Sequence, residues 1–133
     1  MDNKNIAESK GRRKKVVLVE DEQLHAKTLT FAISNKFNCD VFVAGNGHEG
    51  YTLICDKLPD VVILDIMMPI LNGYSLLEMI KTMEETRNIP VVILTNLDKQ
   101  HEIKRGTSLG ASEYLIKHKR SLQEVLEVIG RYV

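Results

Sequence analysis

The sequence predicts an α/β protein built on a five-stranded parallel sheet that is wound with helices on both faces. Strand-like and helix-like segments alternate five times along the 133 residues, an order that is typical of parallel sheets. Three of the strand-like segments are unbroken runs of Val, Ile and Leu, as expected for strands that helices cover on both sides. The connections between the strands are expected to be right-handed.

The first half of the chain contains two expected strands, each followed by an expected helix. Residues 15–20 carry the first apolar run, and residues 39–44 form a shorter one. Residues 23–36 place apolar side chains at helical spacing. Residues 48–57 do so as well, after a Gly-Asn-Gly turn at 45–47.

The second half of the chain repeats this order three times, with loops that are marked by Pro and Gly residues. Its helical segments carry apolar residues three to four positions apart. This pattern is weaker in the polar segment 98–109, which ends at Gly110. Its strands and helices are expected, in chain order, at 60–65, 74–86, 89–95, 98–109, 112–117 and 122–129.

Composition and termini narrow the class of protein. Residues 1–14 show no apolar periodicity and are expected to form a flexible tail before a single domain of residues 15–133. The 18 Lys and Arg residues balance 18 Asp and Glu residues, so nothing suggests that this domain binds nucleic acid or an anionic membrane. No apolar stretch approaches the ~20 residues of a membrane span and no signal-peptide core is present, so a cytoplasmic location is expected.

The cysteines and histidines lack the spacing of a metal or redox site. Cys39 and Cys55 are expected to be reduced thiols, because disulfides are unusual in the cytoplasm. Surface or helix-face positions are expected for the four histidines, which are His25, His48, His101 and His118.

Side chains that can handle a phosphoryl group follow four of the five strands. Glu20 and Asp21 follow the first strand, Asp65 the third, Thr95 the fourth and Lys117 the fifth. Parallel strands place their carboxyl ends at one edge of the sheet, where the ligand sites of open α/β proteins lie. We therefore expect these five side chains to converge on one crevice.

The chemistry of this set favours a metal ion and a phosphoryl group. Three carboxylates at one edge repel one another unless a cation joins them, and Mg²⁺ prefers oxygen ligands. An ammonium and a hydroxyl near Asp65 would suit a phosphoryl group carried by its carboxylate. Each residue also has a local explanation: Asp21 or Thr95 could cap a helix, and Lys117 could be a solvated loop residue.

In their order and spacing these residues resemble the receiver (CheY-like) domain of response regulators, the phosphoacceptor module of two-component signalling. The resemblance covers 15–133 and implies a flavodoxin-like fold with strand order 2-1-3-4-5. It rests on Val-Glu-Asp-Glu at 19–22, Leu-Asp-Ile-Met-Met-Pro at 64–69, Asn-Gly at 72–73, Leu-Thr at 94–95, Gly-Ala at 110–111 and Tyr-Leu-Ile-Lys at 114–117.

The resemblance implies a phosphoacceptor and a metal site. Asp65 would accept a phosphoryl group from a histidine kinase or a histidine phosphotransfer protein. Asp21, Asp65 and the main-chain carbonyl of Met67 would bind Mg²⁺ directly, and Glu20 would hold it through water. The chain would be a regulatory domain rather than an enzyme, with only self-catalysed phosphotransfer and slow autodephosphorylation.

The resemblance also implies a switch. Lys117 would pair with Asp65 and then with the phosphoryl group, and Thr95 would swing toward the phosphoryl oxygens. Tyr114 would turn from an outward to an inward rotamer. These movements would change the output surface made by the helix at 98–109, the strand at 112–117 and the last helix. The chain would be a stand-alone receiver with an output partner, or the N-terminal receiver of a larger regulator.

Three departures from the family pattern stand at the rim of the expected site. His118 replaces the usual Pro after the lysine, so the following loop and partner recognition are expected to differ. Asn96 replaces a small residue and could narrow access. Met67 and Leu97 occupy the variable positions beside an attacking water, which neither side chain can hydrogen-bond, so slow self-dephosphorylation is expected.

Other functions remain open on the sequence. A Mg²⁺-dependent aspartyl-phosphate phosphatase would need Asp-x-Asp after the first strand, where this chain has Glu20-Asp21-Glu22. A flavin or nucleotide binder would need a phosphate-binding loop at the same place, where these acids would repel phosphate. A receiver-like binding module that works without phosphorylation would not need the intact acids, Thr95 and Lys117.

Overall fold

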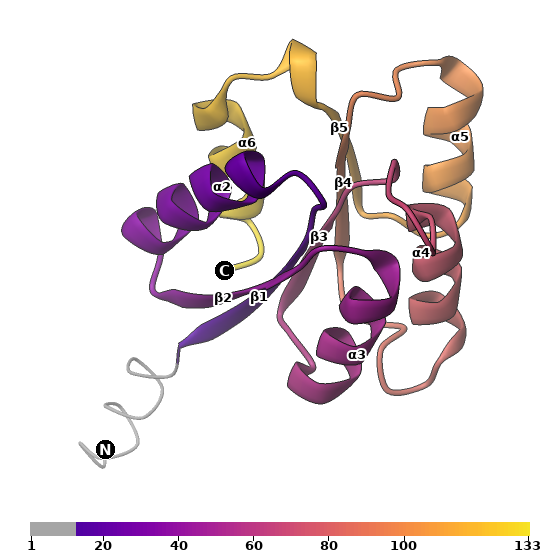
Figure 1. The fold of residues 1–133 in the computed structure, drawn as a ribbon, viewed down its shortest axis with the longest axis horizontal. Helices are drawn as coiled ribbons and strands as arrows, with labels where there is room; N and C mark the ends of the chain where they lie inside the picture. Colours follow the sequence, from indigo (N-terminus) through magenta and orange to yellow (C-terminus); the bar gives the residue numbers. More distant parts are fainter. Residues whose placement is uncertain (1–12) are drawn as a thin grey trace.

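The computed structural model describes residues 13–133, which alternate between strand and helix as the sequence predicts (Figure 1). A short 3₁₀ turn, η1, precedes the last helix. The elements are β1 (Lys14–Val19), α2 (Gln23–Lys36), β2 (Cys39–Ala44), α3 (Gly47–Lys57), β3 (Val61–Leu64), α4 (Gly73–Thr82), β4 (Val91–Thr95), α5 (Gln100–Ser108), β5 (Glu113–Ile116), η1 (Lys117–Lys119) and α6 (Leu122–Ile129).

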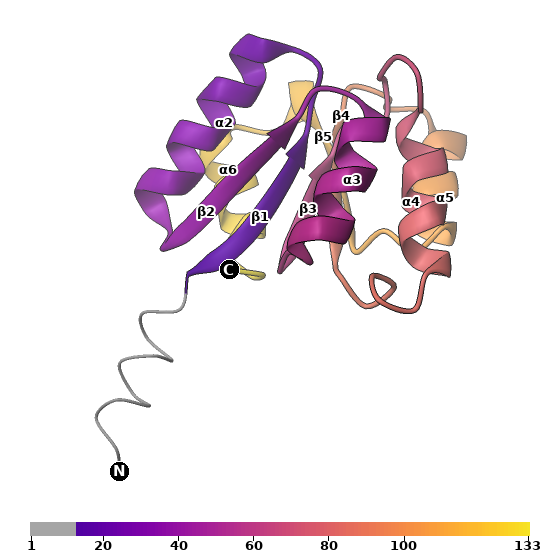
Figure 2. The ribbon, with the colours of Figure 1, turned by 60° about the horizontal axis from the view of Figure 1, so that its bottom comes forward.

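The five strands form one parallel sheet in the order β2-β1-β3-β4-β5, which confirms the predicted flavodoxin-like topology. The register brings the ends of neighbouring strands close together: Val19 lies opposite Leu64, and Thr95 lies opposite Ile116. Leu64 lies opposite Ile93, two residues before the end of β4. The carboxyl ends of the strands therefore reach the same edge of the sheet (Figure 2).

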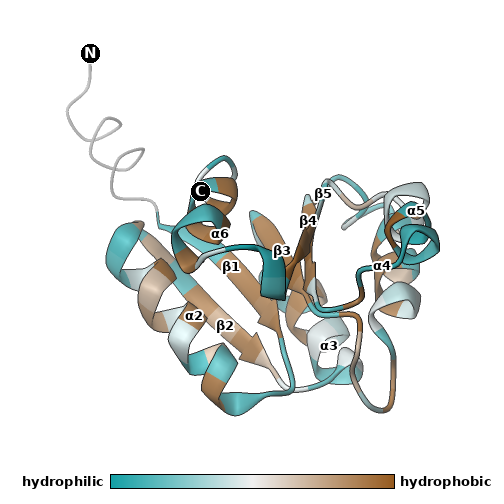
Figure 3. Cartoon of the chain, turned by 90° about the horizontal axis from the view of Figure 1, so that it is seen from above, coloured by the Kyte–Doolittle hydropathy of each residue, from teal (hydrophilic) through white to brown (hydrophobic). Residues whose placement is uncertain are grey.

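Helices cover both faces of the sheet, with α2 and α6 on one face and α3, α4 and α5 on the other (Figure 1). Because side chains alternate along a strand, β1 sends Val16 and Leu18 into the first core and Val17 and Val19 into the second. The strands are the hydrophobic part of the chain and α5 is mainly hydrophilic (Figure 3). This double burial explains why the central strands read as continuous apolar runs.

The structure corrects two expected boundaries. Lys14, expected in the tail, is the first residue of β1, where it pairs with Cys39 of β2; residues 1–12 of the expected tail lie outside the described residues. The helix expected at 74–86 ends at Thr82. Thr86 is buried and its hydroxyl donates to the Ile80 carbonyl at 2.7 Å, so it closes the last turn of α4 instead of extending it. Among the helices of residues 13–133, none has the length and apolar character needed to cross a membrane.

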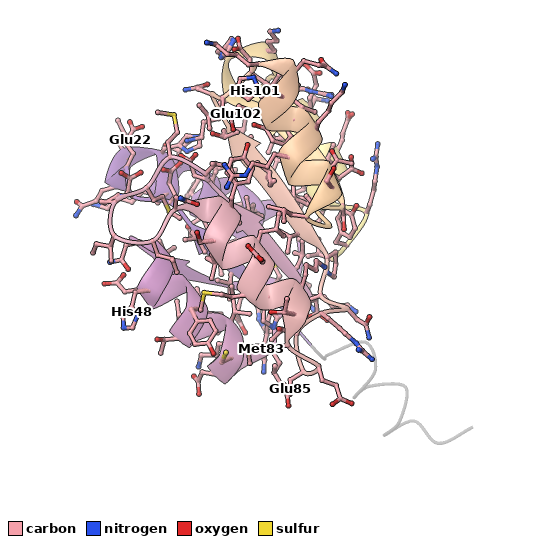
Figure 4. All side chains as sticks on the ribbon, turned by 90° about the vertical axis from the view of Figure 1, so that its right-hand side faces the viewer. Glu22, His48, Met83, Glu85, His101 and Glu102 are labelled. Atoms are coloured by element: carbon pink, nitrogen blue, oxygen red, sulfur yellow. The ribbon has the colours of Figure 1, made fainter. Side chains whose placement is uncertain are left out.

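A buried tyrosine joins α4 to α5. Tyr74 is 4% exposed, and its hydroxyl lies 2.5 Å from Glu102 Oε2 and 2.9 Å from the Glu102 carbonyl oxygen. The Arg105 guanidinium lies 4.4 Å from the centre of the Tyr74 ring, within cation–π distance. Burial and the hydrogen bond to Glu102 raise the pKa of Tyr74, so the hydroxyl stays a donor. Glu102 lies on the side of α5 that Figure 4 shows beside α4.

We predict that Tyr74→Phe destabilises the fold by about 1–2 kcal/mol, because the ring stays buried while the Glu102 acceptors lose their donor. Urea denaturation measures the change. Tyr51→Phe is the matched control: the Tyr51 hydroxyl, on α3, donates only to the weak acceptor Met83 Sδ at 3.4 Å, and its loss should leave stability unchanged. Equal effects of the two substitutions would contradict the anchoring role of Tyr74.

Candidate functional site

A lysine and two buried acids from three different strands meet at the carboxyl edge of the sheet. Lys117 Nζ lies 2.6 Å from Glu20 Oε1 and 2.9 Å from Asp65 Oδ2. Glu20 follows β1, Asp65 follows β3 and Lys117 follows β5, so the three are distant in sequence. The side chains of Glu20 and Asp65 are 2% and 9% exposed. The predicted convergence of these residues is what the structure shows.

Asp21 completes the acidic group on the solvent side. Carboxylate oxygens of Glu20, Asp21 and Asp65 all lie within 4.8 Å of one another. The pKa of Asp21 is raised by partial burial, by a hydrogen bond with Glu20 and by the negative charges of Glu20 and Asp65. Among the ion pairs of residues 13–133, Lys117 bridges the other two acids and none involves Asp21.

This donor set fits a divalent cation of the Mg²⁺ type. All three ligand groups are carboxylates, which hard cations prefer, and one ammonium faces three negative charges. A cation beside exposed Asp21 would relieve the repulsion that raises the pKa of that residue.

Glu20 is held in its charged form by donors from two elements. His25, in the first turns of α2, places Nδ1 2.5 Å from Glu20 Oε1, and the Glu22 amide donates to Oε2 at 3.2 Å. Burial opposes ionisation, but the hydrogen bonds from His25 and Lys117 and the charge of Lys117 outweigh it and lower the pKa of Glu20 to about 2. Glu20 is thus a fixed negative charge behind Asp21 and Asp65.

His25 is a site residue that the sequence analysis missed, since all four histidines were expected to be surface or helix-face residues without a site role. The local signal for the contact between His25 and Glu20 is weak. It consists of a carboxylate at the end of a strand and a histidine in the first turns of the next helix. It becomes meaningful only when the turn at 21–22 folds the helix back over the strand end.

The local explanations for Asp21 and Thr95 do not hold. Helix α2 begins after Glu22 and α5 begins after Lys99, and neither helix has a side-chain cap. The helices on the same edge that begin after Asn46, Asn72 and Ser121 all have one. Asp21 and Thr95 are therefore not committed to helix capping.

Met67 contacts Asp65, and Thr95 ends the strand next to the one that Asp65 follows. Thr95 is fully buried at the end of β4, and its hydroxyl oxygen accepts from the Leu97 amide at 3.4 Å. The Met67 amide donates to Asp65 Oδ1 at 3.1 Å, and Met67 is 58% exposed at the rim. With Lys117 on Oδ2, both oxygens of Asp65 accept hydrogen bonds in this structure.

Gly73 lets the first turn of α4 approach the backbone at Asp65. A Cβ atom on Gly73 would lie 2.6 Å from both the Asp65 carbonyl oxygen and the Ile66 Cα. The Gly73 amide donates to the Ile66 carbonyl at 3.0 Å, which closes the loop between them. In the Asn-Gly pair at 72–73, Asn72 thus caps α4, and Gly73 allows the helix to lie against the backbone of Asp65 and Ile66.

Tyr114 lies over α5, with its hydroxyl at the loop that follows Thr95. The hydroxyl donates to the Leu97 carbonyl at 2.8 Å, and the half-buried ring packs on Gly106. A Cβ on Gly106 would come within 2.9 Å of the ring and 2.8 Å of Ile93 Cδ1. Gly106 was not singled out from the sequence, because a glycine inside a helix normally only weakens it.

The loop after β5 begins with Lys117 and places His118 directly behind it. Residues 117–119 form η1, and no cis peptide bond occurs within 13–133. The His118 amide donates to Asn96 Oδ1 at 3.1 Å, so the Asn96 side chain is turned toward η1. Asn96 therefore links two loops at the rim of the site.

Taken together, the site offers a buried carboxylate, an ammonium in contact with it, a neighbouring hydroxyl and an all-oxygen group for a cation. Such a set can stabilise the charge of a phosphoryl group attached to Asp65.

Comparisons with known proteins agree with this geometry. The family model of the response regulator receiver domain matches residues 16–129. Protein PilG of Pseudomonas aeruginosa is 31% identical over 119 residues, which cover 90% of this chain and 87% of PilG. The solved receiver domain of the Francisella response regulator 1452 is 30% identical with a TM-score of 0.81, and the match covers 90% of this chain and 96% of that one.

The chain also matches a segment of a much larger protein. The gliding motility regulatory protein of Myxococcus xanthus is 30% identical over 120 residues, which cover 90% of this chain but 15% of that protein. What these relatives share with the chain is the domain itself. This chain belongs to the response regulator receiver domain family, the receiver module of two-component signalling.

Proposed function

We propose that this chain is a phosphorylation-dependent switch in which Asp65 accepts a phosphoryl group from a histidine kinase or a histidine phosphotransfer protein. The observation that carries the proposal is the contact of Lys117 with both Asp65 and Glu20, with Asp21 beside them. In the transfer, the phosphorus–nitrogen bond of the donor phosphohistidine breaks, and a phosphorus–oxygen bond to the Asp65 carboxylate forms. The donor imidazole leaves with its electron pair.

Mg²⁺ is the cation of this proposal. Asp21, Asp65 and the Met67 main-chain carbonyl would hold it, and it would supply positive charge to the phosphoryl oxygens. Glu20 would act through water, a role that fits the three hydrogen bonds its two oxygens already accept from His25, Lys117 and Glu22.

The switch would pass from Asp65 to the surface formed by α5, β5 and α6. Thr95 would turn from the Leu97 amide toward the phosphoryl group, and Tyr114 would then occupy the space that Thr95 leaves. The fixed contacts of Tyr114 with Leu97 and Gly106 support the proposal, because a change in the loop at Leu97 reaches the ring directly. The proposal also includes a cognate kinase and a cytoplasmic location. The switched surface would act on an output partner or on a further output domain.

We predict that acetyl phosphate, in the presence of Mg²⁺, adds one phosphate to the chain and that Asp65→Asn abolishes the addition. Intact-mass measurement with and without Mg²⁺ tests this. Asp56→Asn, at an exposed acid of α3, is the matched control and should be phosphorylated like the wild type.

Two outcomes would contradict the proposed function. Absence of phosphate on the wild type in Mg²⁺ would support a binding module that works without phosphorylation. Continued turnover of small phosphate esters would indicate a phosphatase instead.

We predict that Met67→Asn shortens the lifetime of the phosphorylated form by roughly tenfold, because an amide can orient a water that the thioether cannot. The measurement is the loss of phosphate after removal of the donor. Met67→Leu keeps the apolar character and should keep the wild-type lifetime. An unchanged lifetime in Met67→Asn would remove the orientation of water as the reason for slow dephosphorylation.

We predict that Glu20 makes stability depend on pH in acid. Its pKa of about 2 in the fold lies below the ordinary value of 4.5, so its contribution is complete above about pH 4.5 and is lost as the pH falls toward 2. Glu20→Gln should therefore lower the free energy of unfolding near neutral pH by up to about 3 kcal/mol, and less as the pH falls.

Urea denaturation in Mg²⁺-free buffer between about pH 7 and pH 3 measures this difference. Glu127→Gln, at an exposed residue of α6, serves as the control and should follow the wild-type curve. A constant gap between the wild type and Glu20→Gln across this range would disprove the linkage.

A further inference from the structure

His118 bridges the two loops that carry the lysine and the threonine of the site. It directly follows Lys117 in η1, and it contacts Asn96 and Asp98 in the loop that follows Thr95. Its ring Nδ1 lies 3.1 Å from Asn96 Oδ1, and its Nε2 lies 3.3 Å from Asp98 Oδ2. Nothing in the proposed phosphoryl chemistry uses these three side chains.

Both ring nitrogens of His118 face acceptors. The His118 amide also donates to Asn96 Oδ1, and this bond fixes which end of the Asn96 amide points at the ring. A carbonyl oxygen and a carboxylate oxygen can only accept, so each neutral tautomer would turn one unprotonated nitrogen toward an oxygen lone pair. Only the imidazolium can donate to both partners.

We propose that His118 is a positioning residue of the switch. As an imidazolium it donates to both Asn96 and Asp98, and we call this pair of contacts, which joins the loop at Asn96–Asp98 to the turn at Lys117, the clip. In mildly acidic solution the clip restrains the movement of Thr95 and so slows phosphorylation of Asp65. The inference rests on the proposed function for its effect on phosphorylation, but the contact itself does not.

Charged groups of both signs surround the ring of His118. Asp98 faces the ring from the loop after β4. The cations of its own segment are Lys117, whose ammonium is engaged by Glu20 and Asp65, exposed Lys119, and Arg120, which lies 3.7 Å from Glu124 of α6. Because only the protonated ring donates to both partners, we expect the contact to tighten in acidic solution and to loosen in alkaline solution.

The contact with Asp98 is half-exposed, and its expected strength is accordingly small. The side chains of His118 and Asp98 are 48% and 44% exposed. Exposed pairs of this kind change an unfolding equilibrium by a factor of about 2–5. A factor of this size in the free loop is enough to alter a rate measurably, and neither substitution at these positions disturbs the core.

The first experiment is a double-mutant cycle of His118→Gln and Asp98→Asn, measured by urea denaturation near pH 6 and near pH 8. We expect a coupling between the two sites of about 2–5-fold in the unfolding equilibrium near pH 6, and none near pH 8. His48→Gln, at an exposed histidine of α3 (Figure 4), should show no coupling with Asp98→Asn at either pH. No coupling of His118 with Asp98 near pH 6 would overturn the clip.

The second experiment compares the rate of phosphorylation by acetyl phosphate in the wild type and in His118→Gln at the same two pH values. We expect the wild type to be about 2–5-fold slower than His118→Gln near pH 6 and equal to it near pH 8, while His48→Gln equals the wild type at both. Equal rates near pH 6 would overturn the positioning role even where the coupling is present. A wild type that takes no phosphate at either pH would refute the proposed function. The double-mutant cycle of His118 and Asp98 would then still test whether the clip exists.

Discussion

The site depends on one electrostatic arrangement, in which the Lys117 ammonium lies between the carboxylates of Glu20 and Asp65. Each carboxylate alone at this depth would be costly to keep charged, and two together would repel each other. The shared ammonium makes both charges tolerable, and His25 adds a second donor on the Glu20 side. Asp21, which has no such partner among the described ion pairs, is left where a cation can approach it.

The parallel sheet is what makes this arrangement possible. In a parallel sheet with aligned strand ends, residues 45 positions apart or more become neighbours without any long loop having to reach over the core. Gly73 then holds the loop after Asp65 close to α4, and the buried Thr95 sits at the end of the adjacent strand. The ends of the strands and the segments that directly follow them thus carry the chemical groups, and the loops after β4 and β5 carry contacts that join them at the rim of the site.

Two sets of contacts connect these loops to the rest of the fold. Tyr114 reaches the Leu97 carbonyl from β5, and His118 reaches Asn96 and Asp98 from η1. Tyr74 independently fastens α5 to α4 through Glu102. If Thr95 moves as proposed, the hydrogen bonds on both sides of the loop that follows it would resist the movement.

The sequence by itself determined the strands, the order of elements and the five residues at the strand ends, because apolar runs and strand-end positions are local properties of the chain. It could not place His25 on Glu20, Gly106 under Tyr114 or the end of α4 at Thr82. These features depend on contacts between segments that are not neighbours in a local pattern: the donor to the Glu20 carboxylate, the space for the Tyr114 ring and the bond that ends α4. Such contacts form only when the segments pack together. The contacts of His118 with Asn96 and Asp98 are of the same kind. The sequence showed a histidine where the family usually has proline, and only the tertiary structure decided which residues this histidine contacts.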